Sequence, residues 1–208
     1  LETMNPKYLL FILSINLISF SLSSQDVWSP EESMKIKSIN QTDISNDGEY
    51  IAYVVREAIM KDKKSEFLSQ IWVYNTGGSQ SIQYTFNEKS STSPKFSPDG
   101  ARIAFISDRA GQNNLWVMDA DGSNPRQVQN SSETRVTMPE WTVDGEYILV
   151  TQDGGIWMYH PDGGEGVEVV PTSDGSASWP SVSTDGQYVY YQVQTPGDPV
   201  PWLSLIHI

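Results

Sequence analysis

The sequence predicts an all-β fold, namely a β-propeller of four-stranded antiparallel blades that is incomplete at about four blades and is preceded by a signal peptide. Two observations favour this fold. An Asp-Gly turn recurs roughly 40–50 residues apart, and a tryptophan recurs in step with it. A β-sandwich with chance Asp-Gly turns is the alternative interpretation. The structural repeat motif comprises Asp47, Gly48, Trp72, Asp99, Gly100, Trp116, Asp144, Gly145, Trp157, Asp185 and Gly186.

The clearest copy of the repeat runs from Ser91 to Val128. Its first turn, at 97–100, reads Ser-Pro-Asp-Gly: the proline presets φ, the aspartate bonds the backbone and the glycine accepts a positive φ. A second turn, Ala-Asp-Gly-Ser, follows at 120–123. Two hairpins in series make a meander of about 35–40 residues, the size of one propeller blade. The predicted strands are 94–97, 102–107, 114–119 and 125–128.

The first copy of the repeat is longer than the others. Asp47 and Trp72 lie 25 positions apart, against 17 and 13 positions for the corresponding residues of the second and third copies. The additional residues, roughly Arg56–Ser69, must therefore project as a loop or hairpin between the second and third strands. Long insertions on a rigid scaffold often carry binding sites. A solvated insertion without a binding role is the alternative.

The first 25 residues have the pattern of a secretory signal peptide. Lys7 supplies the positive charge, residues 8–20 form an apolar run, and small residues near 23–25 offer a cleavage site. The apolar run is shorter than the ~20 residues of a membrane span, and a retained anchor is the alternative. We expect an exported protein, periplasmic or extracellular, that meets a membrane only through this segment.

The predicted propeller occupies residues 26–202. It is introduced by Ser29, which is suited to N-cap a short helix that begins at Pro30. The last six residues, 203–208, are expected to be a non-native tail, because their sequence is identical to one reading-frame translation of a transposase adapter used in sequencing libraries. A native apolar terminus is the alternative. The remaining length accommodates close to four blades of about 40–45 residues.

Composition excludes several function classes. The formal net charge of −13 argues against nucleic-acid binding, which requires a basic surface. Many of the acidic residues occupy predicted turns, so they do not by themselves indicate a cationic substrate. The chain has no cysteine, which excludes disulfides, zinc–thiolate sites and a cysteine nucleophile.

The stretch from Pro94 to Trp116 reads P-x-[FW]-S-P-D-G-x-x-I-A-F-x-S-D-R-x-G-x-x-x-[LI]-W and resembles the repeat of TolB-type β-propellers. The other copies match more loosely, because Asn46, Val143 and Thr184 replace the turn proline. The resemblance implies a propeller that usually has six or more blades, so we expect this chain to be the N-terminal piece of a longer protein. It specifies the fold better than the function.

Two further resemblances concern the parent protein. The opening segment 26–39 and the stretch 56–72 resemble the propeller of exported prolyl-oligopeptidase-type serine peptidases, particularly the acylaminoacyl-peptidase branch. The stretches 119–128 and 157–167 resemble propellers fused to exported metal-dependent amidohydrolases. The chain is therefore either related to both groups or a composite of two parents.

The sequence offers no catalytic, cofactor-binding or metal-binding residues. It contains no G-x-S-x-G nucleophile elbow, and His160 and His207 are too few and too far apart for a metal centre or a triad. We interpret His160 as a turn residue. The stretch 119–124 begins like a calcium loop but lacks the later ligands, so a hairpin turn explains it better. Arg109 is expected to pair with Asp108 and to brace neighbouring blades.

Three functions are compatible with these sequence features. The first is a non-catalytic propeller of an exported serine peptidase, which gates or binds peptide substrate for a missing C-terminal α/β-hydrolase domain of the same chain. The second is the propeller of an exported amidohydrolase, and the third is a TolB-like module that binds envelope proteins. For this chain we expect a peptide or protein partner, no nucleic acid and no cofactor.

Overall fold

The computed structural model describes residues 29–61, 64–78, 80–172 and 175–208, and the predicted signal peptide lies outside them. The chain divides into two compact units, residues 1–34 and 35–208, which are described separately. In the first unit, helix α2 (Pro30–Met34) follows Ser29, whose Oγ accepts a hydrogen bond from the backbone N–H of Glu32 at 3.1 Å. This is the predicted N-cap.

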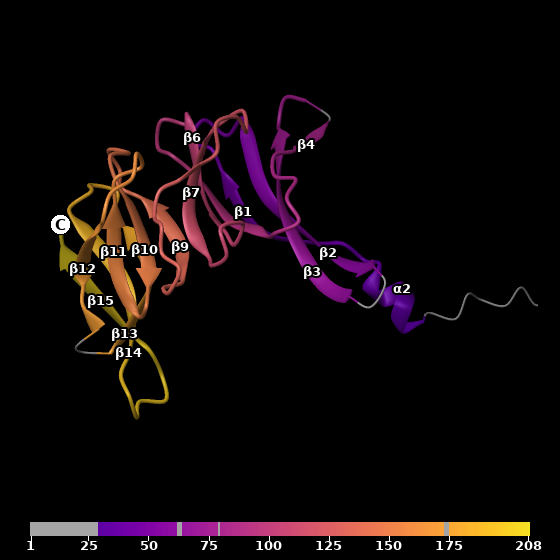
Figure 1. The fold of residues 1–208 in the computed structure, drawn as a ribbon. Coiled ribbons are helices and arrows are strands. Elements are labelled where there is room, and N and C mark those ends of the chain that lie inside the picture. Colours follow the sequence, from indigo (N-terminus) through magenta and orange to yellow (C-terminus); the bar gives the residue numbers. More distant parts are fainter. Residues whose placement is uncertain (1–28, 62–63, 79, 173–174) are drawn as a thin grey trace, which may run out of the picture. The chain divides into compact units, whose positions relative to one another are not determined.

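The second unit consists of four antiparallel sheets, each built from strands that follow one another along the chain (Figure 1). We call these sheets blades 1 to 4. Three of them have four strands and blade 4 has three. Blade 1 contains β1 (Ser38–Ile44), β2 (Tyr50–Lys61), β3 (Lys64–Asn75) and β4 (Ser81–Gln83). Blade 2 contains β5 (Ser91–Phe96), β6 (Arg102–Ser107), β7 (Asn114–Asp119) and β8 (Arg126–Gln127). Blade 3 contains β9 (Val136–Trp141), β10 (Ile148–Gln152), β11 (Gly155–Tyr159) and β12 (Val167–Val170). Blade 4 contains β13 (Ser176–Val182), β14 (Tyr188–Gln194) and β15 (Trp202–His207).

Hydrophobic cores join each blade to the next. Between blades 1 and 2 the core includes Val54, Ile71 and Phe105, all with no exposed surface. The corresponding cores between blades 2 and 3 and between blades 3 and 4 centre on Leu115 and on Leu149. A middle strand of a sheet packed on both faces reads as a continuous apolar run, and β6 accordingly buries five of its six residues.

The insertion in blade 1 is a hairpin, which is one of the two forms that the sequence predicts. Strands β2 and β3 are 12 residues each and pair without interruption from Tyr50↔Asn75 to Lys61↔Lys64. Strand β1 accompanies β2 only as far as Arg56. The guanidinium of Arg56 lies 3.8 Å from the centre of the Phe67 ring and covers part of this ribbon.

Blade 4 includes residues 203–208, which the sequence analysis predicts to be a non-native tail. Strand β15 pairs with β14 from Tyr188↔His207 to Val193↔Trp202. Side chains alternate across this sheet, so Val189 is buried against blade 3 while Tyr190 and Leu205 are exposed on the opposite face. The pairing does not bear on the origin of residues 203–208, and their non-native origin stays a prediction.

Candidate functional site: a groove across the first strands

The Asp-Gly turns of the repeat motif have one geometry in all four blades. In blade 1 the Ser45 hydroxyl donates to Asp47 Oδ1 at 2.6 Å, and the N–H of Glu49 donates to the same oxygen at 2.9 Å. Gly48 has a φ of 72°, which favours glycine. The equivalent serine or threonine donates to the aspartate of each other blade: Ser97 to Asp99, Thr142 to Asp144 and Ser183 to Asp185.

Those hydrogen bonds explain the acidity of the turn aspartates. The hydroxyl donor, followed by the backbone N–H, holds the pKa of each of the four carboxyls below its ordinary value. Each carboxylate is therefore engaged by its own turn. Two of the three repeated tryptophans pack against cores: Trp116 against the core between blades 1 and 2, and Trp157 against the core between blades 2 and 3.

A second repeated feature lies on the first strand of each blade. Gln41, Ser93, Met138 and Trp179 have φ values of 49°, 52°, 56° and 57°. At the same places the pairing of the first strand with the second is interrupted, between residues 40 and 43, 92 and 95, 137 and 140, and 178 and 181. Each first strand thus contains a β-bulge, a feature that re-aims side chains and is common beside functional sites.

The four bulges line one groove. First strands of successive blades contact one another, and the groove that crosses them has a volume of about 530 Å³. Its lining includes the four residues with positive φ and the residues that follow them, among them the buried Pro94, Pro139 and Pro180. Sites for small ligands commonly measure about 300–1,000 Å³. We call this feature the first-strand groove.

Charged side chains occupy equivalent positions two residues after the bulges. Lys95 Nζ lies 3.1 Å from Glu140 Oε2 and 3.4 Å from Asp43 Oδ1. The second oxygen of Asp43 accepts a hydrogen bond from the N–H of Phe96 at 2.8 Å. Lys95 and Glu140 line the first-strand groove, whereas Asp43 lines an adjoining hollow together with both of them. The three side chains link blades 1, 2 and 3.

Burial and pairing oppose each other in this ion cluster. Burial alone lowers the pKa of Lys95, but the attraction of Glu140 and Asp43 outweighs it, so the pKa of Lys95 is raised. Burial raises the pKa of Glu140, and the attraction of Lys95 offsets this only in part. The charged form of Glu140 thus depends on Lys95.

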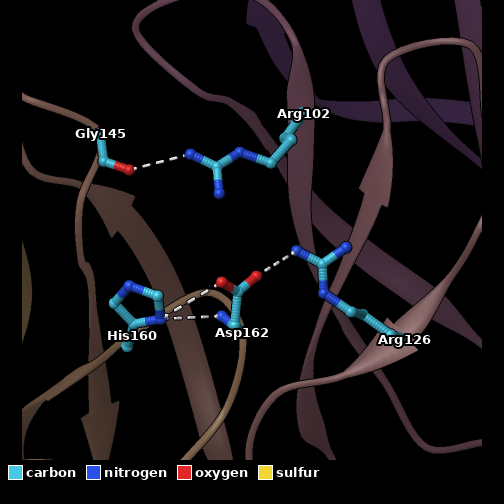
Figure 2. Close-up of polar contacts among 5 residues, drawn as sticks. All are labelled: Arg102, Arg126, Gly145, His160 and Asp162. Carbon is cyan, nitrogen blue, oxygen red and sulfur yellow. Dashed lines mark hydrogen bonds and ion pairs between the residues drawn. The ribbon is translucent and has the colours of Figure 1, made fainter.

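Arg102 and Arg126 make further contacts between blades 2 and 3 (Figure 2). Arg102 Nη2 donates to the carbonyl of Gly145 at 3.0 Å, and Arg126 Nη2 lies 3.0 Å from Asp162 Oδ1. His160 Nδ1 accepts a hydrogen bond from the N–H of Asp162 at 3.2 Å, which makes His160 the turn residue that the sequence predicts. The two arginines link blade 2 to blade 3, whereas the His160 contact lies within blade 3.

The expectation for Arg109 is wrong in part. Its guanidinium donates to the hydroxyls of Ser107 at 3.0 Å and Ser91 at 3.1 Å, and it stacks over Trp116 at 4.7 Å. All these partners belong to blade 2, so within the part of the chain that the structure describes Arg109 braces its own blade. Asp108 Oδ1 is buried without a hydrogen-bond partner. The side chain of Arg109 folds back over its own sheet because the faces of aromatic rings attract a guanidinium.

Sequence reasoning missed the groove residues because their side chains do not repeat. Gln41, Ser93, Met138 and Trp179 share a backbone conformation but no chemistry. The available signal is the proline after the bulge in three blades, at Pro94, Pro139 and Pro180, each placed five residues before an Asp-Gly turn. Among residues 29–61, 64–78, 80–172 and 175–208, no helix is long and apolar enough to cross a membrane. The same residues contain no grouping of histidine and acidic side chains suited to a metal ion.

Four-stranded antiparallel sheets in chain order, joined face to face by hydrophobic cores, define the class of β-propeller proteins. Within that class, residues 47–208 match the family model of the TolB beta propeller domain. The chain therefore belongs to the TolB β-propeller family.

Comparison with known proteins finds similar sequences and similar solved structures. The chain is 38% identical over 117 residues to the uncharacterized peptidase YuxL of Bacillus subtilis, a match that covers 56% of this chain and 17% of YuxL. It superposes on TolB from Acinetobacter baumannii with a TM-score of 0.62 at 22% identity, covering 83% of this chain and 41% of TolB. It superposes on the acylaminoacyl peptidase of Pyrococcus horikoshii with a TM-score of 0.60 at 19% identity, covering 86% of this chain and 32% of that chain.

These similarities differ in what they show. The two structural matches show the fold alone, because their sequence identity is low. The chain spans 17–18% of the length of the curated relatives it matches. The predicted resemblance to TolB and to peptidase propellers is confirmed.

Proposed function

We propose that this chain is the non-catalytic, peptide-binding part of the propeller of an exported serine peptidase, whose catalytic serine belongs to another domain. The similarity to YuxL, which is described as a peptidase, favours this parent over a free-standing binding protein. The absence of a G-x-S-x-G motif from the 208 residues is consistent with a binding role.

The observation that carries the proposal is the first-strand groove. Its four bulges repeat in every blade while their side chains differ from blade to blade, as expected for a surface shaped by a ligand and not by the repeat. Its walls combine apolar groups, such as Met138, with polar ones, such as Gln41 and Asn113. An extended peptide presents both kinds of group, and recognition sites of this mixed character are typical of peptide ligands.

The proposal is tested by titrating fluorescein-labelled hexapeptides with the full 208-residue chain and following fluorescence anisotropy. We expect saturable binding below about 1 mM, a weak affinity typical of one subsite of a larger binding surface. Met138→Asp should abolish the binding, because it places a charge in the groove; aspartate tolerates the positive φ at this position. The matched control is Val167→Asp, on β12 outside the groove, where the native side chain is 59% exposed.

Mass spectrometry of the same mixtures tests the non-catalytic part of the proposal. All peptides should remain intact after prolonged incubation. Cleavage above that of a heat-denatured control would contradict a non-catalytic role. Absence of saturable binding, or equal losses for Met138→Asp and Val167→Asp, would contradict the groove as the binding site.

A further inference from the structure

The first-strand groove changes character along its length. The bulge residues of blades 1 and 2 are Gln41 and Ser93, and these two are joined, since the Ser93 N–H donates to Gln41 Oε1 at 3.1 Å. The bulge residues of blades 3 and 4 are Met138 and Trp179. The bulge residues are thus polar at one end of the groove and apolar at the other, where Pro139 and Pro180 also line the wall.

Trp179 combines an exposed ring with a strained backbone. Its surface is 61% exposed although it lies on the first strand of a blade, where the flanking Ala177 and Pro180 are buried. Its φ of 57°, close to that of the other three bulge residues, is a conformation that residues as bulky as tryptophan rarely adopt. Strained residues that persist in a structure cluster at ligand-binding positions. An exposed indole that is held in a strained conformation on the wall of a cavity points to a ligand with an apolar group.

The ion cluster reaches the apolar end through Glu140, which lies two residues after Met138 and lines the same groove, and its charge restricts what can accompany the apolar group. Lys95 is the only cation among the described residues that line the groove and the adjoining hollow, and Glu140 and Asp43 both pair with it. The cluster therefore carries one more negative than positive charge. A neutral or basic ligand can approach it, whereas an acidic ligand is repelled.

We infer that the blade 3–4 end of the groove is a subsite for a bulky apolar side chain of an extended peptide, and that it rejects peptides with acidic residues next to that side chain. Trp179 and Met138 form the apolar contact surface, and the Asp43–Lys95–Glu140 cluster supplies the discrimination. This inference rests on the proposed function and specifies its ligand.

Four fluorescein-labelled hexapeptides test the subsite: Gly-Ser-Leu-Phe-Ser-Gly, Gly-Ser-Ser-Ser-Ser-Gly, Gly-Lys-Leu-Phe-Lys-Gly and Gly-Glu-Leu-Phe-Glu-Gly. The Leu-Phe peptide with serines should bind about tenfold or more tightly than the all-serine peptide, because it buries an additional apolar side chain. The lysine peptide should bind at least as tightly. The glutamate peptide should bind several-fold more weakly, and added salt should reduce that difference.

Trp179→Ala should abolish the preference for Leu-Phe over serine, and Trp179→Phe should retain most of it. The matched control is Trp202→Ala, which removes a tryptophan of similar exposure, 62%, that lies outside the groove. Both native side chains are exposed, so both alanine variants should fold, which circular dichroism verifies.

The outcomes separate the two claims. If the peptides bind without a Leu-Phe preference, or if Trp202→Ala weakens that preference as much as Trp179→Ala, the subsite is wrong while peptide binding stands. If the glutamate peptide binds as tightly as the lysine peptide, the charge discrimination is wrong. If none of the four peptides binds, the proposed function itself is overturned.

Discussion

At the Asp-Gly turns the four blades make the same hydrogen bond from a hydroxyl to the aspartate, whereas at the first-strand bulges they share a backbone conformation but differ in side chain. Asp47 and Asp144 each accept one hydroxyl and one backbone hydrogen bond, so their carboxylates complete a turn. Met138 and Trp179 share a positive φ with Gln41 but differ from it in polarity.

The difference separates what a repeat needs for folding from what it leaves free. A turn requires glycine at a positive φ and an acceptor for its free N–H groups, so sequence repetition there reflects backbone chemistry. A bulge on the first strand is fixed by the strand pairing on either side, so its side chain can vary. The most repeated residues are consequently structural, and the varied ones are the candidates for binding.

The largest effect on stability is expected in the hydrophobic core between blades 1 and 2, away from the turns and the bulges. Phe105 is fully buried and packs against Trp116, with ring centres 6.5 Å apart. Phe105→Ala should lower the free energy of unfolding by about 3–5 kcal/mol, because it leaves a cavity. Urea denaturation followed by circular dichroism measures this loss. A loss below about 1 kcal/mol would mean that the two blades do not share a packed core.

The next effect concerns the ion cluster beside the groove. Lys95→Met should destabilise the protein by about 1–2 kcal/mol near neutral pH, discounted for the partial exposure of both partners, because Glu140 keeps its charge and loses its counter-ion. Burial already raises the pKa of Glu140, and the substitution raises it further. The loss should therefore shrink as the pH falls through the pKa of Glu140 and its carboxyl becomes protonated.

Urea denaturation of Lys95→Met and of the native chain at about pH 7.5 and about pH 4 measures this dependence. Lys89→Met, which changes a lysine outside the cluster, serves as the control and should show no such trend. A destabilisation that is equal at both pH values would show that the loss comes from packing and not from the charge of Glu140.

An effect of similar size, equal in the two blades compared, is expected at the turns. Gly100 and Gly145 have φ values of 70° and 72°. An added Cβ would meet nothing within 4 Å at Gly100, and at Gly145 it would meet Pro98, with Cδ at 3.4 Å and Cγ at 3.9 Å. Each alanine substitution should therefore cost about 1–2 kcal/mol from backbone strain alone. Thermal denaturation compares the two variants, and peptide affinity should not change. Losses that differ by more than about 1 kcal/mol would show that the turns are not equivalent.

The smallest effect on stability is expected at the bulge of blade 4. Trp179→Ala removes an exposed side chain and should change the free energy of unfolding by less than about 0.5 kcal/mol. Chemical denaturation of this variant beside Trp202→Ala measures the change. A destabilisation above about 2 kcal/mol would mean that Trp179 is part of the packing and not of a binding surface.

Much of the fold follows from local signals in the sequence. The predicted strands 102–107 and 114–119 coincide with β6 and β7, because turn residues bound them on both sides. Strand β5 begins at Ser91, earlier than the predicted start at 94, because the bulge at Ser93 interrupts its pattern. A periodic pattern cannot reveal a residue that is added to one strand of a pair.

The groove could not be predicted in the same way, because it joins residues from four blades. Asp43, Lys95 and Glu140 meet only when first strands from successive repeats lie side by side. Within its own repeat, each of these residues is an ordinary charged residue on a strand. Alignment of the repeats on their Asp-Gly turns, with attention to positions that do not match, is the procedure that finds them.

The division of roles between turns and bulges is tested most directly by photo-crosslinking with the hexapeptide Gly-Ser-Leu-Phe-Ser-Gly in which benzoylphenylalanine replaces Phe. After irradiation with the native chain, proteolysis and mass spectrometry locate the modified residues. We predict adducts within residues 137–140 and 179–181, which unlabelled peptide suppresses and Trp179→Ala reduces. Adducts at the Asp-Gly turns, or adducts spread evenly over the blades, would contradict the assignment of structure to the turns and binding to the bulges.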